Sequence, residues 1–212
     1  MQNVQEENGK GATMIKEEIA PGIVVYSDVI PDSQNLYTDL EEGMVAAGFQ
    51  WNAAAVKESS DPMVNTKTRD TSTFGIPYKG EIKDILTENI SEAFLVNVNN
   101  LFFEHFDPVE KDYMATYGIF SKWHDTYGIL KYGEGQQFTN HIDDHPSYHR
   151  RVSTVYYLNE NYTGGEINFP RFGVTLKPKA NQMIVFPSTY VYNHSVSPVI
   201  EGERYAVVSW LR

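Results

Sequence analysis

The sequence of 212 residues contains no cysteine, which excludes a disulfide framework, a zinc-thiolate site and a cysteine nucleophile. It also lacks any run of about 18 apolar residues, so it predicts no membrane-spanning helix. Basic residues are in deficit, because 17 Lys and Arg oppose 28 Asp and Glu. Binding to duplex nucleic acid requires cations that neutralise phosphates, and nucleic acid is therefore not an expected partner. The polar N-terminal residues show no secretory signal, and we expect a cytoplasmic protein.

Hydrophobic residues make up 41% of the sequence and aromatic residues 13%. At this length, such a composition predicts a single domain with a sizeable core and excludes an intrinsically disordered chain. The acidity is unevenly distributed: residues 1–110 hold 7 Lys and Arg against 19 Asp and Glu, whereas residues 111–212 hold 10 against 9. We therefore expect two halves with different roles, in a protein that is a monomer.

The first half begins with a polar segment, residues 1–12, that is predicted to be a disordered tail. Residues 13–112 then read as a support region of helices and strands. A β-branched run from Ile23 predicts a strand. The helix expected next has three apolar residues on one face and a glycine at its end: Leu36, Leu40, Met44 and Gly48.

Two longer segments follow in the first half. Residues 61–79 are polar and contain Pro62, Gly75 and Pro77, which indicates a long loop or a β-finger of the kind that is often functional. Apolar residues then recur near the 3.6-residue period of a helix over residues 81–104. The residues on this apolar face are Ile82, Ile85, Leu86, Ile90, Ala93, Phe94, Leu101 and Phe102. We expect this helix to support a sheet.

From residue 113 the sequence changes to short aromatic and β-branched segments, separated by Gly, Pro and Asn. There are nine of them: YGIFSKWH, TYGILKYGEG, QQFTNHID, RVSTVYYLN, GEINFP, GVTLKP, QMIVFP, NHSVSPV and RYAVVSWLR. Nine short strands at this spacing indicate an all-β sandwich or barrel. Residues 113–212 are therefore expected to form the core that carries the chemistry.

Histidines and one aspartate offer two competing metal sites. Three histidines recur every four residues, as they would on one helix face: His141, His145 and His149. However, Pro146 disfavours a helix in that stretch. Alternatively, His141 and Asp143 are separated by one residue in an extended segment and point to the same side, with His194 as the natural third ligand. Two imidazoles and one carboxylate leave coordination positions open on Fe(II).

Arg204 is the lone cation in an apolar strand pattern, ten residues beyond His194. Buried arginine is rare unless it is paired, and the planar guanidinium can bind a carboxylate through two parallel hydrogen bonds. A dicarboxylate such as 2-oxoglutarate would chelate iron at its oxo-acid end and place its distal carboxylate on Arg204. An internal ion pair with Asp or Glu is the alternative.

Three motifs in this order, YGEGQQFTNHID, YYLN followed by GGE, and H-x9-RYAVVSW, resemble those of the Fe(II)/2-oxoglutarate dioxygenases, and within them the prolyl 4-hydroxylases. The resemblance is strong over residues 113–212 and loose before them. It implies a mainly β fold with flanking helices around a double-stranded β-helix, or jelly-roll, core. It also implies Fe(II), the cosubstrates 2-oxoglutarate and O2, and ascorbate as a further candidate.

The resemblance assigns the metal ligands and the carboxylate anchor to His141, Asp143, His194 and Arg204. Tyr132, nine residues before His141, occupies the position of a family tyrosine that hydrogen-bonds the same carboxylate. Tyr157 is similar to the pocket tyrosine of the oxygen-sensing prolyl hydroxylases, and Trp210 matches a tryptophan beside the cosubstrate. Collagen-type enzymes usually carry Lys at the position of Arg204 and Thr at that of Ile167, so the pocket is more similar to the oxygen-sensing branch.

For a peptide substrate, the resemblance implies an arginine at the start of the YYLN strand, which favours Arg150, with Arg151 as the alternative. It also implies a finger over the peptide, in which residues 65–77 resemble an Arg-Thr-Ser region. The matching residues there are Arg69, Thr71 and Ser72. His145 and His149 flank this site and are further candidates for substrate contact.

The expected activity is hydroxylation of peptidyl proline, coupled to oxidative decarboxylation of 2-oxoglutarate to succinate and CO2, in the manner of procollagen-proline 4-dioxygenases. The expected partner is a proline-containing peptide or protein. Two alternatives stay open at this point. One is a 2-oxoglutarate oxygenase that hydroxylates a free amino acid or another small molecule, and the other is a non-catalytic β-helix domain that binds a sugar or a protein.

Overall fold

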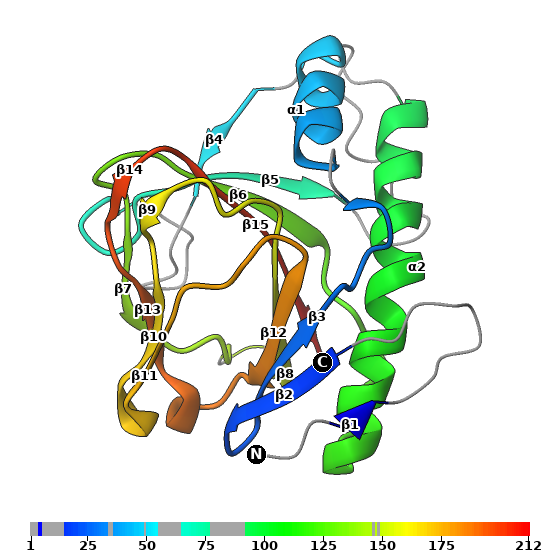
Figure 1. Ribbon diagram of the computed structural model, residues 1–212, viewed down its shortest axis with the longest axis vertical. Coiled ribbons are helices and arrows are strands. Elements are labelled where there is room, and N and C mark those ends of the chain that lie inside the picture. The colour runs from blue at the N-terminus through cyan, green and yellow to red at the C-terminus, as the bar shows by residue number, and fades with distance from the viewer. Residues whose placement is uncertain are drawn as a thin grey trace.

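A β-barrel with a long helix along one side makes up most of the molecule in this computed structural model (Figure 1). The structure describes residues 4–5, 15–33, 36–48, 50–54, 65–76, 92–145, 147 and 149–212. The expectation of a mainly β, jelly-roll type fold with flanking helices is confirmed. No helix in these described ranges has both the length and the apolar character needed to cross a membrane.

The strands form one large sheet, one small sheet and a two-stranded ribbon. The nine-stranded sheet contains, in spatial order, β1 (Val4–Gln5), β2 (Ile15–Ala20), β3 (Ile23–Ser27), β12 (Gln182–Pro187), β8 (Val152–Tyr157), β15 (Arg204–Leu211), β6 (Tyr127–Tyr132), β5 (Ser72–Ile76) and β4 (Asn52–Ala53). The four-stranded sheet contains β11 (Val174–Leu176), β10 (Ile167–Phe169), β13 (His194–Val196) and β7 (Phe138–His141). The ribbon pairs β14 (Val199–Glu201) with β9 (Thr163–Gly164). Short 3-10 helices cover Pro170–Phe172 and Tyr190–Tyr192.

Strand β15 shows how the period-two alternation of a strand divides the core into two. Ala206 and Val208 point into the barrel, where they meet side chains of both sheets. Tyr205 and Val207 point the other way and join a second cluster, which packs against helix α2. The same alternation holds in β6 and β8, so the large sheet is buried on both faces.

Helix α2 (Glu92–Tyr117) covers the outer face of the large sheet (Figure 1). Phe102 and Phe106 are almost fully buried, and their rings meet the ring of Tyr127 on β6 at centroid distances of 5.5 and 5.7 Å. A helix was expected over residues 81–104 as a support for the sheet. Its second half is confirmed, and its first half lies outside the described residues.

The helix also runs past the boundary expected at residue 113, through Pro108 to Tyr117. The predicted strand YGIFSKWH is therefore wrong, since its first residue ends the helix and the next six form no strand. A single β-bridge joins His124 to Leu211. The segment lacks the buried face that a barrel strand needs, since Phe120 and Trp123 are 67% and 70% exposed. The other eight segments each contain a strand, although β9 and β14 were not expected.

In the first half, β3 confirms the strand expected from Ile23, and α1 (Leu36–Ala46) confirms the next helix, with Leu40 and Met44 buried. Gly48 follows α1 at φ 71°, the left-handed conformation that ends helices. Strand β2 was not expected. Val4–Gln5 pairs with it, although these residues fall in the predicted disordered tail; the other residues of 1–12 lie outside the described ranges.

The expected finger, residues 61–79, is described only over 65–76. Its last part is β5, which pairs with β4 and β6 at the edge of the large sheet. Its first part lies against β7, because the backbone N–H of Thr139 donates to the carbonyl of Thr68 at 2.8 Å. The described part of the segment is thus a turn beside β7, the strand that ends in His141, followed by a strand near the edge of the large sheet.

Candidate metal and dicarboxylate site

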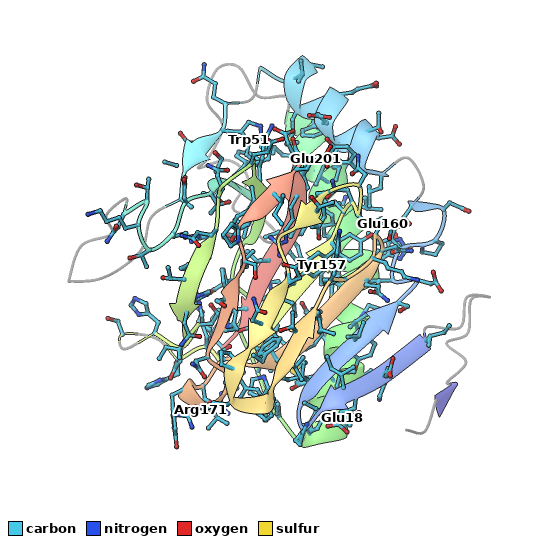
Figure 2. All side chains as sticks on the ribbon, turned by 60° about the vertical axis from the view of Figure 1, so that its left-hand side comes forward. Glu18, Trp51, Tyr157, Glu160, Arg171 and Glu201 are labelled. Carbon is cyan, nitrogen blue, oxygen red and sulfur yellow. The ribbon has the colours of Figure 1, made fainter. Side chains whose placement is uncertain are left out.

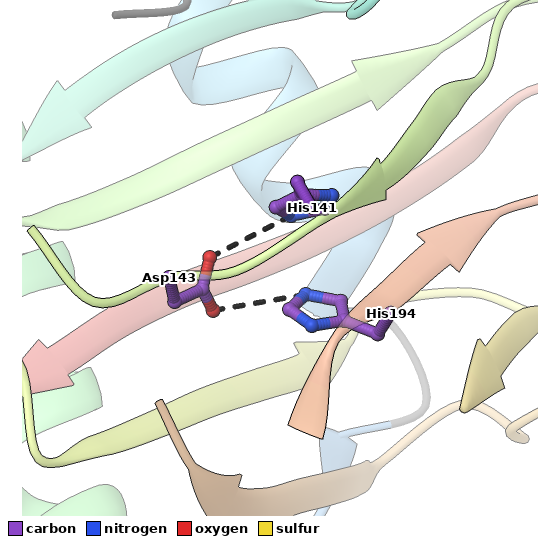
Figure 3. Close-up of side chains that lie close together, drawn as sticks. All are labelled: His141, Asp143 and His194. Carbon is purple, nitrogen blue, oxygen red and sulfur yellow. Dashed lines mark ion pairs between the residues drawn. The ribbon is translucent and has the colours of Figure 1, made fainter. Parts of the chain in front are cut away.

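His141 is the last residue of β7 and His194 the first residue of β13. The two strands are antiparallel neighbours, and these two histidines are direct register partners. Asp143 lies in the extended segment after β7. One ligand atom from each of the three residues lies within 4.8 Å of the other two. Figure 3 shows both imidazoles turned toward the Asp143 carboxylate between them.

The hydrogen bonds of both imidazoles determine which nitrogen faces the centre of the site. The Nδ1 atom of His141 lies 2.9 Å from the Thr139 carbonyl oxygen, and that of His194 lies 3.1 Å from the Tyr192 carbonyl oxygen. Since a carbonyl can only accept, each Nδ1 carries the hydrogen. Each Nε2 therefore presents its lone pair toward Asp143, at 3.6 and 3.7 Å from its carboxylate oxygens.

The pKa values of Asp143 and His194 are both shifted by their surroundings. Burial alone would raise the pKa of Asp143, but the charge of His194 and the hydrogen bond and charge of His141 hold it well below its usual range. A hydrogen bond from Trp210 acts in the same direction. Burial, followed by the charge of His141, lowers the pKa of His194 to about 4. The carboxylate is thus kept ionised and His194 neutral, which are the states that bind a metal.

This donor set fits a divalent iron ion. Two neutral imidazole nitrogens and one carboxylate, on one side of a common point, form the arrangement typical of non-haem Fe(II) with open positions. The alternative set of three histidines is not brought together. The described residues between His141 and Arg150 are not helical, and His149 is exposed, with its Nδ1 3.4 Å from Asp144.

Arg204 begins β15, opposite Tyr132 on β6, and only 1% of its surface is exposed. Its Nη2 donates to the Tyr157 hydroxyl at 3.2 Å, and its guanidinium lies 4.8 and 4.9 Å from the ring centres of Tyr132 and Tyr157. Figure 2 shows Tyr157 in the middle of the barrel. Tyr132 and Tyr157 thus both lie against the guanidinium, and their expected roles toward a bound carboxylate stay predictions.

The guanidinium of Arg204 has hydrogen-bond donors that no described residue uses. Nε and Nη1 are buried and have no hydrogen-bond partner among the described residues, and no carboxylate of those residues pairs with it. A buried cation with open donors is costly unless a ligand supplies the acceptors. This observation favours the carboxylate-anchor interpretation over the internal ion pair.

Four residues of β15 share the barrel interior: Arg204, Ala206, Val208 and Trp210. Arg204 is at one end of this row and Trp210 near the other. Ala206 and Val208 between them are buried, so the guanidinium and the Trp210 ring lie toward opposite ends of the same face of β15.

Trp210 lies at the metal end of this row, close enough to the Asp143 carboxylate to lower its pKa. Arg150, the favoured candidate for peptide contact, lies with its guanidinium carbon 3.6 Å from the centre of the Trp210 ring. Its Nε pairs with Asp125 at 3.1 Å. Arg151 is exposed, and its backbone N–H donates to Leu211. Of the two arginines, Arg150 is the one at the metal site.

Arg69, the other candidate for substrate contact, lies with its guanidinium 4.9 Å from the centre of the Phe138 ring. Phe138 in turn stacks on His141, with ring centres 3.5 Å apart. Thr71 is buried and donates to the Lys131 carbonyl at 2.7 Å, and Ser72 begins β5. Of these three residues, Arg69 is the one linked to His141, through one aromatic ring.

Sequence reasoning missed three residues of the site. Phe138 is three residues before His141, so strict alternation along β7 would place the two on opposite faces. Their rings stack where the register between β7 and β13 shifts, and the sequence carries no signal for this shift. Tyr162 lies beside Arg204. Burial raises the pKa of this tyrosine, and the charge of Arg204 offsets part of that rise. It was one tyrosine among 14. Asp125 precedes β6 and carries no motif, so only the fold brings it to Arg150.

Residues 127–212 match the family described as the 2OG-Fe(II) oxygenase superfamily. The chain is 38% identical over 84 residues to a PKHD-type hydroxylase of Prochlorococcus marinus (strain NATL2A), a match that covers 37% of each chain. It is 30% identical over 86 residues to a hypoxia-inducible factor prolyl hydroxylase of Caenorhabditis elegans, over 37% of this chain and 12% of that protein. These matches thus span well under half of the relatives' lengths.

Solved structures match over a larger part of the chain. A prolyl-4-hydroxylase of Pseudomonas putida aligns with a TM-score of 0.66 and 21% identity, over 90% of this chain and 92% of that one. A prolyl hydroxylase of Trichoplax adhaerens, solved with a hypoxia-inducible factor peptide, aligns with a TM-score of 0.65 and 15% identity, over 90% and 83%. Residues 127–212 thus match the 2OG-Fe(II) oxygenase superfamily in sequence, and the fold of the chain is of the prolyl hydroxylase type.

Proposed function

We propose that this protein is an Fe(II)- and 2-oxoglutarate-dependent hydroxylase that acts on proline in a peptide or protein. One observation carries the proposal: His141, Asp143 and His194 converge at one place in the barrel, and Arg204 presents buried, open donors to the same interior. Either feature alone occurs in proteins without this activity. Together they match the two ends of a 2-oxoglutarate molecule bound to iron.

His141 and His194 would bind the iron through Nε2, and Asp143 through its carboxylate. Arg204 and the Tyr157 hydroxyl would bind the distal carboxylate of 2-oxoglutarate, with Tyr132 and Tyr162 excluding water from it. The bound iron supplies the oxidative chemistry, in which O2 and 2-oxoglutarate yield succinate, CO2 and a hydroxylated substrate carbon. The role of the chain is to orient both reactants in a dry pocket.

The choice of proline in a peptide is supported by the relatives, whose names include prolyl hydroxylases, and by the peptide bound in the Trichoplax structure. It is also supported by Arg69, a cation in the segment beside β7 that lies near the candidate metal ligands. Hydroxylation at the 4-position follows from the resemblance. Ascorbate is proposed as a reductant that sustains turnover, and the monomer and the cytoplasmic location stay predictions.

The test begins without any peptide. Anaerobic Fe(II) with 2-oxoglutarate should give the weak visible charge-transfer band expected of this family, and His141→Ala should abolish it. Proline-containing peptides are then supplied with O2, and succinate release is measured together with a mass gain of one oxygen atom on proline. Decarboxylation without modification of any peptide would move the assignment to a free amino acid or another small substrate. No band at all would contradict the oxygenase assignment.

A further inference from the structure

Asp125 lies just before β6 and holds two arginines close to the metal site. Its carboxylate is only 13% exposed, and it lies 3.1 Å from Nε of Arg150 and 2.6 Å from Nε of Arg212. Its backbone N–H donates to the Trp210 carbonyl at 2.8 Å. Asp125 is therefore attached both to the backbone of Trp210 and to the guanidinium that covers the Trp210 ring.

Arg150 contacts the candidate metal ligand Asp143 directly and also lies on Trp210. Its Nη1 donates to the Asp143 carbonyl oxygen at 3.3 Å. Its guanidinium carbon lies 3.6 Å from the centre of the Trp210 ring, and the Trp210 side chain is close enough to the Asp143 carboxylate to lower its pKa. A continuous set of contacts thus runs from Asp125 through Arg150 and Trp210 to the metal-binding carboxylate.

We propose that Asp125 and Arg150 are positioning residues, which hold Trp210 and thereby fix the Asp143 carboxylate in the orientation that binds the metal. A ligand carboxylate is oriented by the groups that hydrogen-bond it, and metal affinity depends on that orientation. The stack on Trp210 requires a planar guanidinium at a defined angle, and the ion pair with Asp125 sets that angle. This inference rests on the metal site of the proposed function and adds a second role to Arg150.

The negative charge of Asp125 should also affect metal binding in a second way. Arg150 carries a full positive charge beside Asp143, and metal and guanidinium would compete for one carboxylate. Asp125 offers Arg150 a closer anion and keeps the guanidinium on the face of Trp210. Without Asp125, we expect Arg150 to turn toward Asp143 and to oppose metal binding.

The test measures metal binding without 2-oxoglutarate or peptide. The metal-free full-length chain is titrated anaerobically with Co(II), whose visible bands report both its affinity and its coordination geometry. Asp125→Asn and Arg150→Gln should each weaken Co(II) binding by about tenfold or more and alter the bands, as substitutions behind a metal ligand do. Arg150→Lys keeps the charge but not the planar stack, and it should also bind more weakly than the wild type.

Lys131→Gln is the matched control. Lys131 pairs with Glu203 at 2.6 Å and lies over the ring of Tyr205, so it has the same kinds of contact on the outer face of the large sheet. It should leave Co(II) affinity unchanged, and circular dichroism should show that all variants are folded.

Wild-type affinity and bands in Asp125→Asn and Arg150→Lys would overturn the inference, even if Arg150→Gln failed to fold. A wild-type chain that binds no Co(II) would overturn the metal site itself and this inference with it. A third outcome is that the wild type binds Co(II), the variants bind it more weakly and no peptide is hydroxylated. This outcome would support the inference and contradict only the substrate of the proposed function.

Discussion

The two faces of β15 differ in whether their polar groups are satisfied within the chain. On the outer face, the Tyr205 hydroxyl donates to Glu203 at 2.8 Å, and Ser209 is hydrogen-bonded to His124. On the inner face, Arg204 keeps two buried nitrogens without a partner in the described part of the protein. One strand thus has a face completed by folding and a face that a ligand would complete.

On this one strand, residues of the outer face should therefore serve the stability of the fold, and residues of the inner face should serve its function. Polar groups that are paired in the folded chain contribute to folding, and their loss is costly. Open, buried donors oppose folding, and they are retained where a ligand repays the cost. Substitutions on the inner face should therefore reduce activity more than stability, and substitutions on the outer face should do the reverse.

The largest effect is expected from the metal ligands. Asp143→Ala removes one of three ligands and the anion that offsets the cation, so iron binding and hydroxylation should both be lost. Removal of the metal by a chelator should have the same effect on the wild type and should be reversed by added Fe(II). The measurements are the charge-transfer band and succinate release. Wild-type turnover in Asp143→Ala would show that this carboxylate does not bind the metal.

Phe106→Ala tests the outer face. The Phe106 ring is 1% exposed and packs against the rings of Phe102, Tyr127 and Tyr156. Its removal leaves a cavity between α2 and the sheet, and we expect a loss of about 3–5 kcal/mol in the free energy of unfolding. Denaturant melts would measure this loss. Turnover per folded molecule should be close to that of the wild type, and a specific loss of activity would contradict the separation of the faces.

Arg204→Met tests the inner face. Methionine keeps most of the side-chain volume but cannot bind a carboxylate, so the lost charge-assisted hydrogen bonds of about 1.5–3 kcal/mol should raise the KM for 2-oxoglutarate about 10- to 150-fold. The free energy of unfolding should stay the same or rise, because a buried cation without a carboxylate partner is removed. Arg204→Lys should recover part of the affinity. A large loss of stability would mean that Arg204 serves the fold.

The smallest effect concerns pH and the pair of His124 with Glu110, which joins the outer face to α2 at 3.0 Å. Burial would lower the pKa of His124, but the hydrogen bond and charge of Glu110 outweigh it and raise this pKa. The pair of His124 with Glu110 therefore stabilises the fold fully at pH values below the pKa of an unfolded histidine, about 6.5. Its contribution is lost as the pH rises through the higher pKa of His124 in the folded chain.

Glu110→Gln removes the cause of this shift. Its cost in the free energy of unfolding should thus be larger at about pH 6 than at about pH 9. Denaturant melts of both proteins at the two pH values measure the difference. A cost that does not change with pH would contradict the assignment of a protonated His124 to the folded state.

The metal ligands could be predicted from the sequence because their signal is local. His141 and Asp143 are alternate residues of an extended segment, and Arg204 is a cation in an apolar strand pattern. Arg150 could be placed only by a register count, and the sequence could not show that it lies on Trp210. Asp125 could not be predicted at all, since its role depends on contacts with residues 25 and 87 positions away.

By itself, the sequence determined the class of fold and the chemistry of the site. Period-two alternation dictates two-faced strands, and the types of residue at positions 141, 143, 194 and 204 predict a site for iron and a carboxylate. Only the tertiary structure decided that α2 runs on to Tyr117 and that Arg150 packs behind Asp143. The physical reason is that alternation and residue type are properties of short segments. Long-range packing instead depends on which surfaces meet once the barrel has closed.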